Sequence, residues 1–208
     1  MVSRNHFFDA LKDDHLMSSH DIVVSLFRLG WIFSKMGEYE KGIEYVERGL
    51  EIATNSNDTN GTVQCLHTKG WINFLVGDFE DAIDCAHEAL GISREINDKR
   101  SISLCLNVIQ AAVNGLERYG EALEINERCI NIGRELGDQL IISRGLCNQG
   151  EHFRKQHNYL ESIDCYEESL RISRVIDQKN LICITLYNLG FALNQLGRFD
   201  EAQKSSSE

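Results

Sequence analysis

A fixed interval of 40 residues governs this chain. The aromatic residues Tyr39, Phe79, Tyr119, Tyr159 and Phe199 are spaced by 40 each time, and so are Leu26, Leu66, Leu106, Leu146 and Leu186. Columns that stay in register along the chain mark an internal repeat, in which each unit buries its apolar side against its neighbours.

Each period contains two helices, because its apolar residues recur every three or four positions. The first, helix A, is expected near 20–36, 59–76, 99–116, 139–156 and 179–196. The second, helix B, is expected near 39–54, 79–96, 119–136 and 159–176, with a truncated copy from Phe199. Two columns of small residues predict a close crossing of A and B: Gly30, Gly70, Gly150 and Gly190, with Gln110 in the vacant slot, and Gly42, Ala82, Ala122, Ser162 and Ala202.

The turns carry the residues that helix ends favour. Glycine in the A-to-B turns "MGEY", "VGDF" and "LGRF" suits the left-handed position after a helix. The B-to-A turns "SNDTNG", "INDK", "LGDQ" and "IDQK" contain aspartates that suit helix N-termini. The sequence therefore predicts antiparallel helix hairpins joined by short turns.

The stretch "YNLGFALNQLGRFDEA", residues 187–202, resembles the tetratricopeptide repeat, with its L-G and L-G-x-[FY]-x-x-A signature. The resemblance covers about 20–204 and implies an all-α, right-handed α-solenoid of stacked hairpins. Two features depart from the common pattern: the period is 40 rather than about 34, and no proline ends helix B. The longer form is similar to the repeats of spindle-orientation adaptors and of bacterial signal-responsive regulators.

The resemblance divides the chain into a repeat array and two short ends. Repeats are expected near 20–58, 59–98, 99–138, 139–178 and 179–204, with a tail over 205–208. Residues 1–19 are expected to contain a helix, over 3–16, that packs on the first hairpin.

Composition excludes several classes of protein. No apolar run reaches the length of about 18 residues that a membrane helix needs, and the N-terminus has no continuous apolar core of a secretory signal. The net charge of −11 argues against binding to nucleic acid or to anionic membranes. The seven cysteines lack a C-x-x-C pair and are expected to face the core as reduced thiols, which favours a cytoplasmic protein without a metal or cofactor.

Charge separates the two kinds of helix. The five A helices carry a combined charge of +7, whereas the first four B helices with their leading turns carry −12. In the resembled family, A helices line the concave surface and B helices form the convex back. An acidic back can simply keep the surface hydrated, but that explanation does not require positive A helices.

The family's groove-lining positions give the candidate partner-binding residues. They are Phe27, Trp31 and Lys35 in the first helix A; Gln64, His67, Trp71 and Phe74 in the second; Asn107 and Asn114 in the third; Arg144, Glu151, Arg154 and Lys155 in the fourth; and Tyr187 and Asn194 in the fifth. The tryptophans fit packing between repeats equally well, and the basic residues near 154 fit a hydrated helix end.

The sequence contains no recognisable catalytic motif, so an enzyme is not expected. The leading hypothesis is a scaffold that binds a protein or peptide segment, apolar and acidic in character, in the concave groove. The alternatives are the ligand-sensing part of a signal-responsive regulator and a self-assembling structural repeat. Weak self-association is expected through the C-terminal repeat, where Leu186, Leu189 and Leu193 are predicted to be poorly covered.

Overall fold

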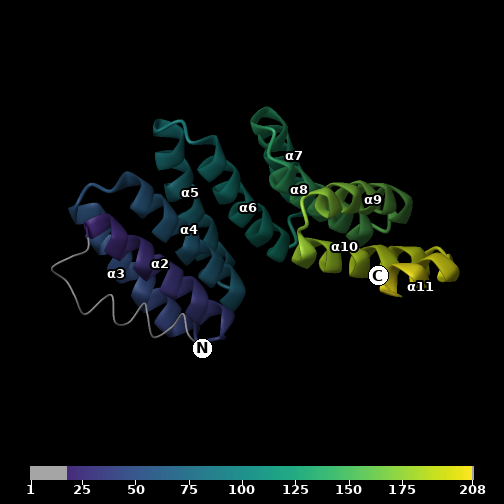
Figure 1. The fold of residues 1–208 in the computed structure, drawn as a ribbon, viewed down its shortest axis with the longest axis horizontal. Coiled ribbons are helices and arrows are strands. Elements are labelled where there is room, and N and C mark those ends of the chain that lie inside the picture. Colours follow the sequence, from purple (N-terminus) through teal and green to yellow (C-terminus); the bar gives the residue numbers. More distant parts are fainter. Residues whose placement is uncertain (1–17, 208) are drawn as a thin grey trace. The chain divides into compact units, whose positions relative to one another are not determined.

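The computed structural model describes residues 18–207, with side chains through Ser205, and this range contains ten helices and no strand (Figure 1). The all-α class and the paired helices predicted from the sequence are therefore confirmed. The helix predicted over 3–16 lies outside the described residues.

The chain divides into two compact units, residues 1–117 and 118–208. In the first unit α2 pairs with α3 and α4 with α5, while α4 contacts α2 on one side and α6 on the other. Its helices are α2 (Ser19–Lys35), α3 (Tyr39–Asn55), α4 (Thr59–Val76), α5 (Phe79–Glu95) and α6 (Lys99–Gly115).

The second unit contains the remaining pairs. Here α8 packs against α9 and α10 against α11, and α8 also contacts α7 and α10. Its helices are α7 (Tyr119–Leu136), α8 (Gln139–Lys155), α9 (Tyr159–Val175), α10 (Lys179–Gln195) and α11 (Phe199–Ser207). The boundary between the units falls inside the third predicted repeat, and α11 continues past the predicted end at 204.

Every turn among the described helices reverses through one residue with positive φ. These residues follow one another at intervals of twenty, and φ ranges from 51° to 94°. They are Gly37, Asn57, Gly77, Asn97, Glu117, Gly137, His157, Asp177 and Gly197. Glycine takes this conformation without steric cost, and Asn and Asp tolerate it better than other side chains do.

Aspartate caps three of the four B-to-A turns, as predicted. The side chains of Asp58, Asp98 and Asp138 accept hydrogen bonds from backbone N–H groups in the first turns of α4, α6 and α8. The prediction is wrong for the fourth turn. There Asp177 takes the left-handed position, and the N-cap of α10 is Gln178, whose side chain makes no capping bond.

The small residues lie where the backbones of A and B helices approach. A Cβ atom on Gly30 would lie 2.8 Å from the carbonyl oxygen of Gly42, and one on Gly70 would lie 3.2 Å from that of Ala82. Ala82 itself is fully buried. The predicted reason for these columns, a close helix crossing, is confirmed in the first unit.

The seven cysteines, all within the described residues, form no disulfide, and most of them face the core. Burial raises the pKa of Cys65 to about 12 and those of Cys105 and Cys165 to about 11, which keeps these thiols protonated and unreactive at neutral pH. The prediction of a core position is wrong for Cys183, which is exposed on α10. None of the described helices is long and apolar enough to cross a membrane.

Candidate functional site on the A helices

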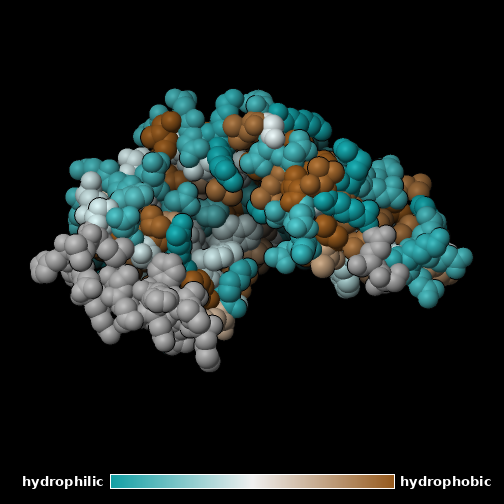
Figure 2. All heavy atoms as spheres, in the orientation of Figure 1, coloured by the Kyte–Doolittle hydropathy of each residue, from teal (hydrophilic) through white to brown (hydrophobic). Residues whose placement is uncertain are grey.

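The candidate residues of the first unit lie on α2, α4 and α6, and those of the second unit on α8 and α10. We refer to the side chains at these groove positions as the A-helix face of each unit. Figure 2 shows one side of the molecule, where hydrophilic surface surrounds separate hydrophobic patches.

Trp31 and Lys35 form an exposed pair on α2. One helical turn separates them, which brings the Lys35 Nζ atom 4.3 Å from the centre of the Trp31 ring. Trp31 keeps 37% of its surface exposed. A large ring with a neighbouring cation and open access is a suitable contact for an apolar side chain.

A row of rings runs from α4 to the start of α5. The Trp71 ring meets Phe74 edge-on at 5.4 Å between centroids, and Phe74 lies 5.9 Å from Phe79. The Trp71 Nε1–H group donates a hydrogen bond to His67 Nε2 over 3.1 Å. Trp71 is half-buried, and its Nε1–H group already has a hydrogen-bond acceptor. Its ring therefore contributes to packing within the unit and keeps part of its surface open to a partner.

The other candidates of the first unit are less accessible. Phe27 packs against the buried cluster around Val23 and Cys65, so much of its surface belongs to the core. Gln64 and Asn107 are half-buried. Asn114 is half-buried too, and its Oδ1 atom is buried without a hydrogen bond from any described residue.

Arg154 is the centre of the A-helix face in the second unit. Its guanidinium carbon lies 4.9 Å from the centre of the Phe191 ring, which joins α8 to α10. The carboxylate of Glu151 lies 4.0 Å from Arg154 Nη2 and 3.5 Å from Lys155 Nζ. Both contacts are longer than a charge-assisted hydrogen bond, so Glu151 balances the two cations only loosely.

Two further cations belong to this face. Lys155 Nζ lies 5.4 Å from the centre of the Tyr119 ring. Arg144 is half-buried, and burial lowers its pKa, while Asp138 opposes that change. Arg144, Arg154 and Lys155 outnumber the single acid, Glu151, and give the face a positive charge.

The outer side of α10 is apolar and open. Tyr187 is 76% exposed and Ile184 is 55% exposed, while Phe191 and Asn194 are exposed one and two turns further on. These side chains share one side of the helix because they are three or four residues apart.

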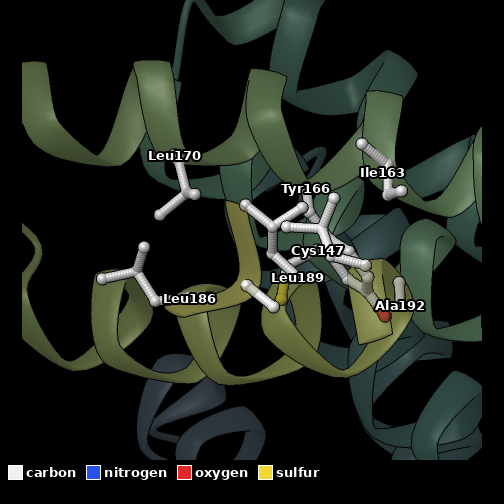
Figure 3. Close-up of a cluster of buried hydrophobic side chains, with 9 residues drawn as sticks. Cys147, Ile163, Tyr166, Leu170, Leu186, Leu189 and Ala192 are labelled. Atoms are coloured by element: carbon white, nitrogen blue, oxygen red, sulfur yellow. The ribbon is translucent and has the colours of Figure 1, made fainter. Parts of the chain in front are cut away.

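The predicted exposure of leucines at this end is wrong. Leu186, Leu189 and Leu193 are buried, because α11 covers α10 and reaches Ser207. Figure 3 shows Leu186 and Leu189 facing Leu170 of α9. A shallow hollow of about 380 Å³ remains beside them, with Glu167, Arg174, Glu201 and Lys204 at its edge.

Tyr166 was not among the site residues predicted from the sequence. It is fully buried beneath the A-helix face, and its hydroxyl has no hydrogen bond from any described residue. A signal was available: Tyr166 stands in a column with Val46, Ala86 and Asn126, and it is the only aromatic residue of the four. Among the described residues, no group of three His, Cys, Asp or Glu side chains is placed to hold a metal ion.

Solved structures share this fold at low sequence identity. A Rap protein complexed with competence and sporulation factor matches with a TM-score of 0.81 and 14% identity, over 93% of this chain and 54% of that one. NprR in complex with its cognate peptide NprX matches with 0.75 and 18%, over 97% and 58%. BtubC from P. vanneervenii matches with 0.75 and 16%, over 90% and 78%.

The chain spans little more than half the length of the Rap and NprR proteins. No curated protein matches its sequence. A family model described as tetratricopeptide repeat matches residues 21–95 and 141–206, and it omits the whole third repeat, where Gln110 replaces the glycine. The match covers well over half of the sequence, and the fold agrees with it. The chain belongs to the tetratricopeptide repeat family.

Proposed function

We propose that this chain is a non-enzymatic module that binds a protein or peptide segment on its A-helix faces. The observation that carries the proposal is the surface around Arg154, where a cation on an aromatic ring adjoins the open apolar side chains of α10. Aromatic and arginine side chains supply most of the binding energy in protein interfaces.

Each A-helix face favours its own kind of contact. In the first unit, Trp31 offers an exposed ring to an apolar side chain. In the second unit, the planar fork of Arg154 suits a carboxylate, to which arginine donates two parallel hydrogen bonds. The open apolar side chains of α10 adjoin Arg154 within the same unit, so we propose a partner that is both apolar and acidic.

Charge on the B helices supports this choice of surface. The combined charge of −12 on the first four B helices with their leading turns repels an acidic segment, whereas the A helices, at +7, attract it. An acidic partner is thus steered toward the A helices during diffusional encounter, most effectively at low ionic strength.

A ligand-sensing role is the second candidate. It is favoured by the structural match to NprR, which was solved in complex with its cognate peptide NprX. In that case a peptide would shift the equilibrium between two arrangements of the helices. Hydrogen exchange with and without the captured peptide separates the candidates, because a passive scaffold gains protection only at the contact surface.

The test compares matched variants of the full chain. Partners are captured from the source lysate, identified by mass spectrometry and titrated at two salt concentrations. We expect Trp31→Ala to weaken binding at both, because apolar burial is not screened. Arg154→Glu should weaken it most at low salt, because screening shortens the reach of exposed charges to about 8 Å at physiological ionic strength.

Arg171→Glu is the control for charge. Arg171 is exposed on α9 in an ion pair with Glu168, and the substitution changes net charge as Arg154→Glu does. We expect it to leave partner binding nearly unchanged. A basic natural partner, or a partner that responds to Arg171→Glu as strongly as to Arg154→Glu, would refute binding through the A-helix face.

A further inference from the structure

The hydroxyl of Tyr166 and Nε of Arg154 are among the buried polar atoms of the second unit that make no hydrogen bond of regular geometry with the described residues. Buried polar groups are nearly always paired, and each exception asks for a physical reason. Tyr166 is fully buried and Arg154 exposes 22% of its side chain. The two residues belong to neighbouring helices, α9 and α8.

Gly150 allows Tyr166 to approach Arg154. A Cβ atom on Gly150 would lie 2.6 Å from the Tyr166 ring, so only glycine leaves room for the ring against α8. Arg154 follows Gly150 by four residues and shares its side of the helix. Burial raises the pKa of Tyr166, and the positive charge of Arg154 is the strongest influence opposing that rise. Figure 3 shows Tyr166 beside Cys147 and Ala192, within the cluster of buried hydrophobic side chains in the second unit.

Phe191 and Glu151 complete the surroundings of Arg154. The Phe191 ring supports the guanidinium at 4.9 Å. The Glu151 carboxylate stands 4.0 Å from Arg154 Nη2, too far for a hydrogen bond. Arg154 therefore lies on a ring with a loosely placed acid in front of it.

We propose that Arg154 binds a carboxylate of the ligand with its Nη atoms, that Tyr166 is the positioning residue that receives its Nε–H group, and that the ligand takes the place of Glu151. This inference rests on the proposed function and names the group that the second unit recognises. Tyr166 contacts no ligand in this arrangement, since its hydroxyl is buried.

The role of Glu151 follows from its loose contacts. It neutralises part of the positive face in the free protein and competes with an incoming acid. Removing its charge should tighten carboxylate binding about two- to fivefold, the range of an exposed ion pair. Loss of the Tyr166 hydroxyl should weaken binding about fivefold, the effect of one hydrogen bond.

The test is a side-chain NMR titration of the full chain labelled with 15N-arginine. The probe is N-acetyl-leucine, which combines an apolar side chain with a carboxylate, and its matched control is N-acetyl-leucine amide. The Arg154 Nε–H signal is assigned with Arg154→Lys. We expect a saturable shift with the acid and none with the amide or with sodium chloride at equal ionic strength.

Variants separate the three roles. Tyr166→Phe should weaken the acid about fivefold while circular dichroism stays native, and Tyr159→Phe, a tyrosine at the start of α9, should not. Glu151→Gln should tighten it, whereas Glu168→Gln on the outer side of α9 should not. An Arg154 signal that ignores the acid, or follows acid and amide alike, overturns the inference, and unchanged affinity in Tyr166→Phe removes the role of Tyr166.

The outcome is independent of partner capture. A carboxylate-dependent shift at Arg154 without any captured partner supports this inference and counts against the proposed function. Capture of a partner whose binding does not shift the Arg154 Nε–H signal supports the proposed function and counts against this inference.

Discussion

Gly30→Ala should destabilise the first unit although alanine is the better helix former. The new Cβ atom would meet the side chain of Val46 and would lie 2.8 Å from the backbone oxygen of Gly42. Val46 can change its rotamer, but the carbonyl of Gly42 cannot move without α3. The substitution therefore acts on the distance between two helix backbones.

The magnitude follows from two opposing effects. Alanine in place of glycine stabilises a helix by about 0.8–1.0 kcal/mol. Overpacking a close contact costs about 1–3 kcal/mol. Gly91, which is exposed on α5 and would meet nothing within 4 Å, is the matched control, since Gly91→Ala has the first effect alone. We expect Gly91→Ala to stabilise by about 1 kcal/mol and Gly30→Ala, after the same gain is subtracted from the overpacking cost, to destabilise by up to about 2 kcal/mol.

The assay is unfolding by urea and by heat, each followed by tryptophan fluorescence. Trp31 and Trp71 are the only tryptophans of the sequence and both belong to the first unit, so their fluorescence reports on this unit. A change of about 1 kcal/mol corresponds to about 4–8 °C in the midpoint of thermal unfolding for a unit of this size. Equal stabilisation by both substitutions would refute the close crossing of α2 and α3.

Three further outcomes are expected. Burial lowers the pKa of His152, so on acidification the histidine of the unfolded chain is protonated before that of the folded chain. The stability of the second unit, followed by circular dichroism, should therefore fall as the pH drops below about 6.5. The same fall of stability with pH in His152→Ile would contradict this. Ellman's reagent should modify one thiol rapidly in the native protein, and Cys183→Ser should abolish that phase. Weak self-association in sedimentation should be lost in Tyr187→Glu, and a strictly monomeric protein at high concentration would argue against any contact through α10.

Periodicity predicted the helices well because each column is repeated. The expected helix over 59–76 coincides with α4, Thr59–Val76, and the expected start at 39 coincides with that of α3. The same columns explain the glycines, since a small residue at every crossing is visible in several copies at once. A single copy would have carried little of this information.

The sequence could not reveal how the C-terminal repeat closes. It suggested a truncated helix B and hence exposed leucines, but the nine residues of α11 are enough to bury Leu189 and Leu193. Coverage depends on where α11 crosses α10, which is a tertiary property. The division at Glu117 was equally invisible, because the 40-residue step continues across it.

Within the candidate site, the sequence predicted which residues occupy groove positions but not which side chains contact one another. The family resemblance placed Arg154 on the A-helix face, yet its contact with Phe191 arises between two helices and depends on rotamers. The position of Tyr166 was harder to predict, because its ring can pack against α8 only where residue 150 has no side chain. The partner-binding residues themselves stay predictions.

The left-handed residue at every twentieth position also limits how this chain can change in length. One residue gained or lost within a helix turns all following side chains of that helix by about 100°, which would carry Arg154 or Tyr187 away from its face. A residue gained at a turn, such as that at Asn57, leaves both flanking helices unrotated. We therefore expect tolerated insertions and deletions to fall at the turns or to come in steps of a whole repeat.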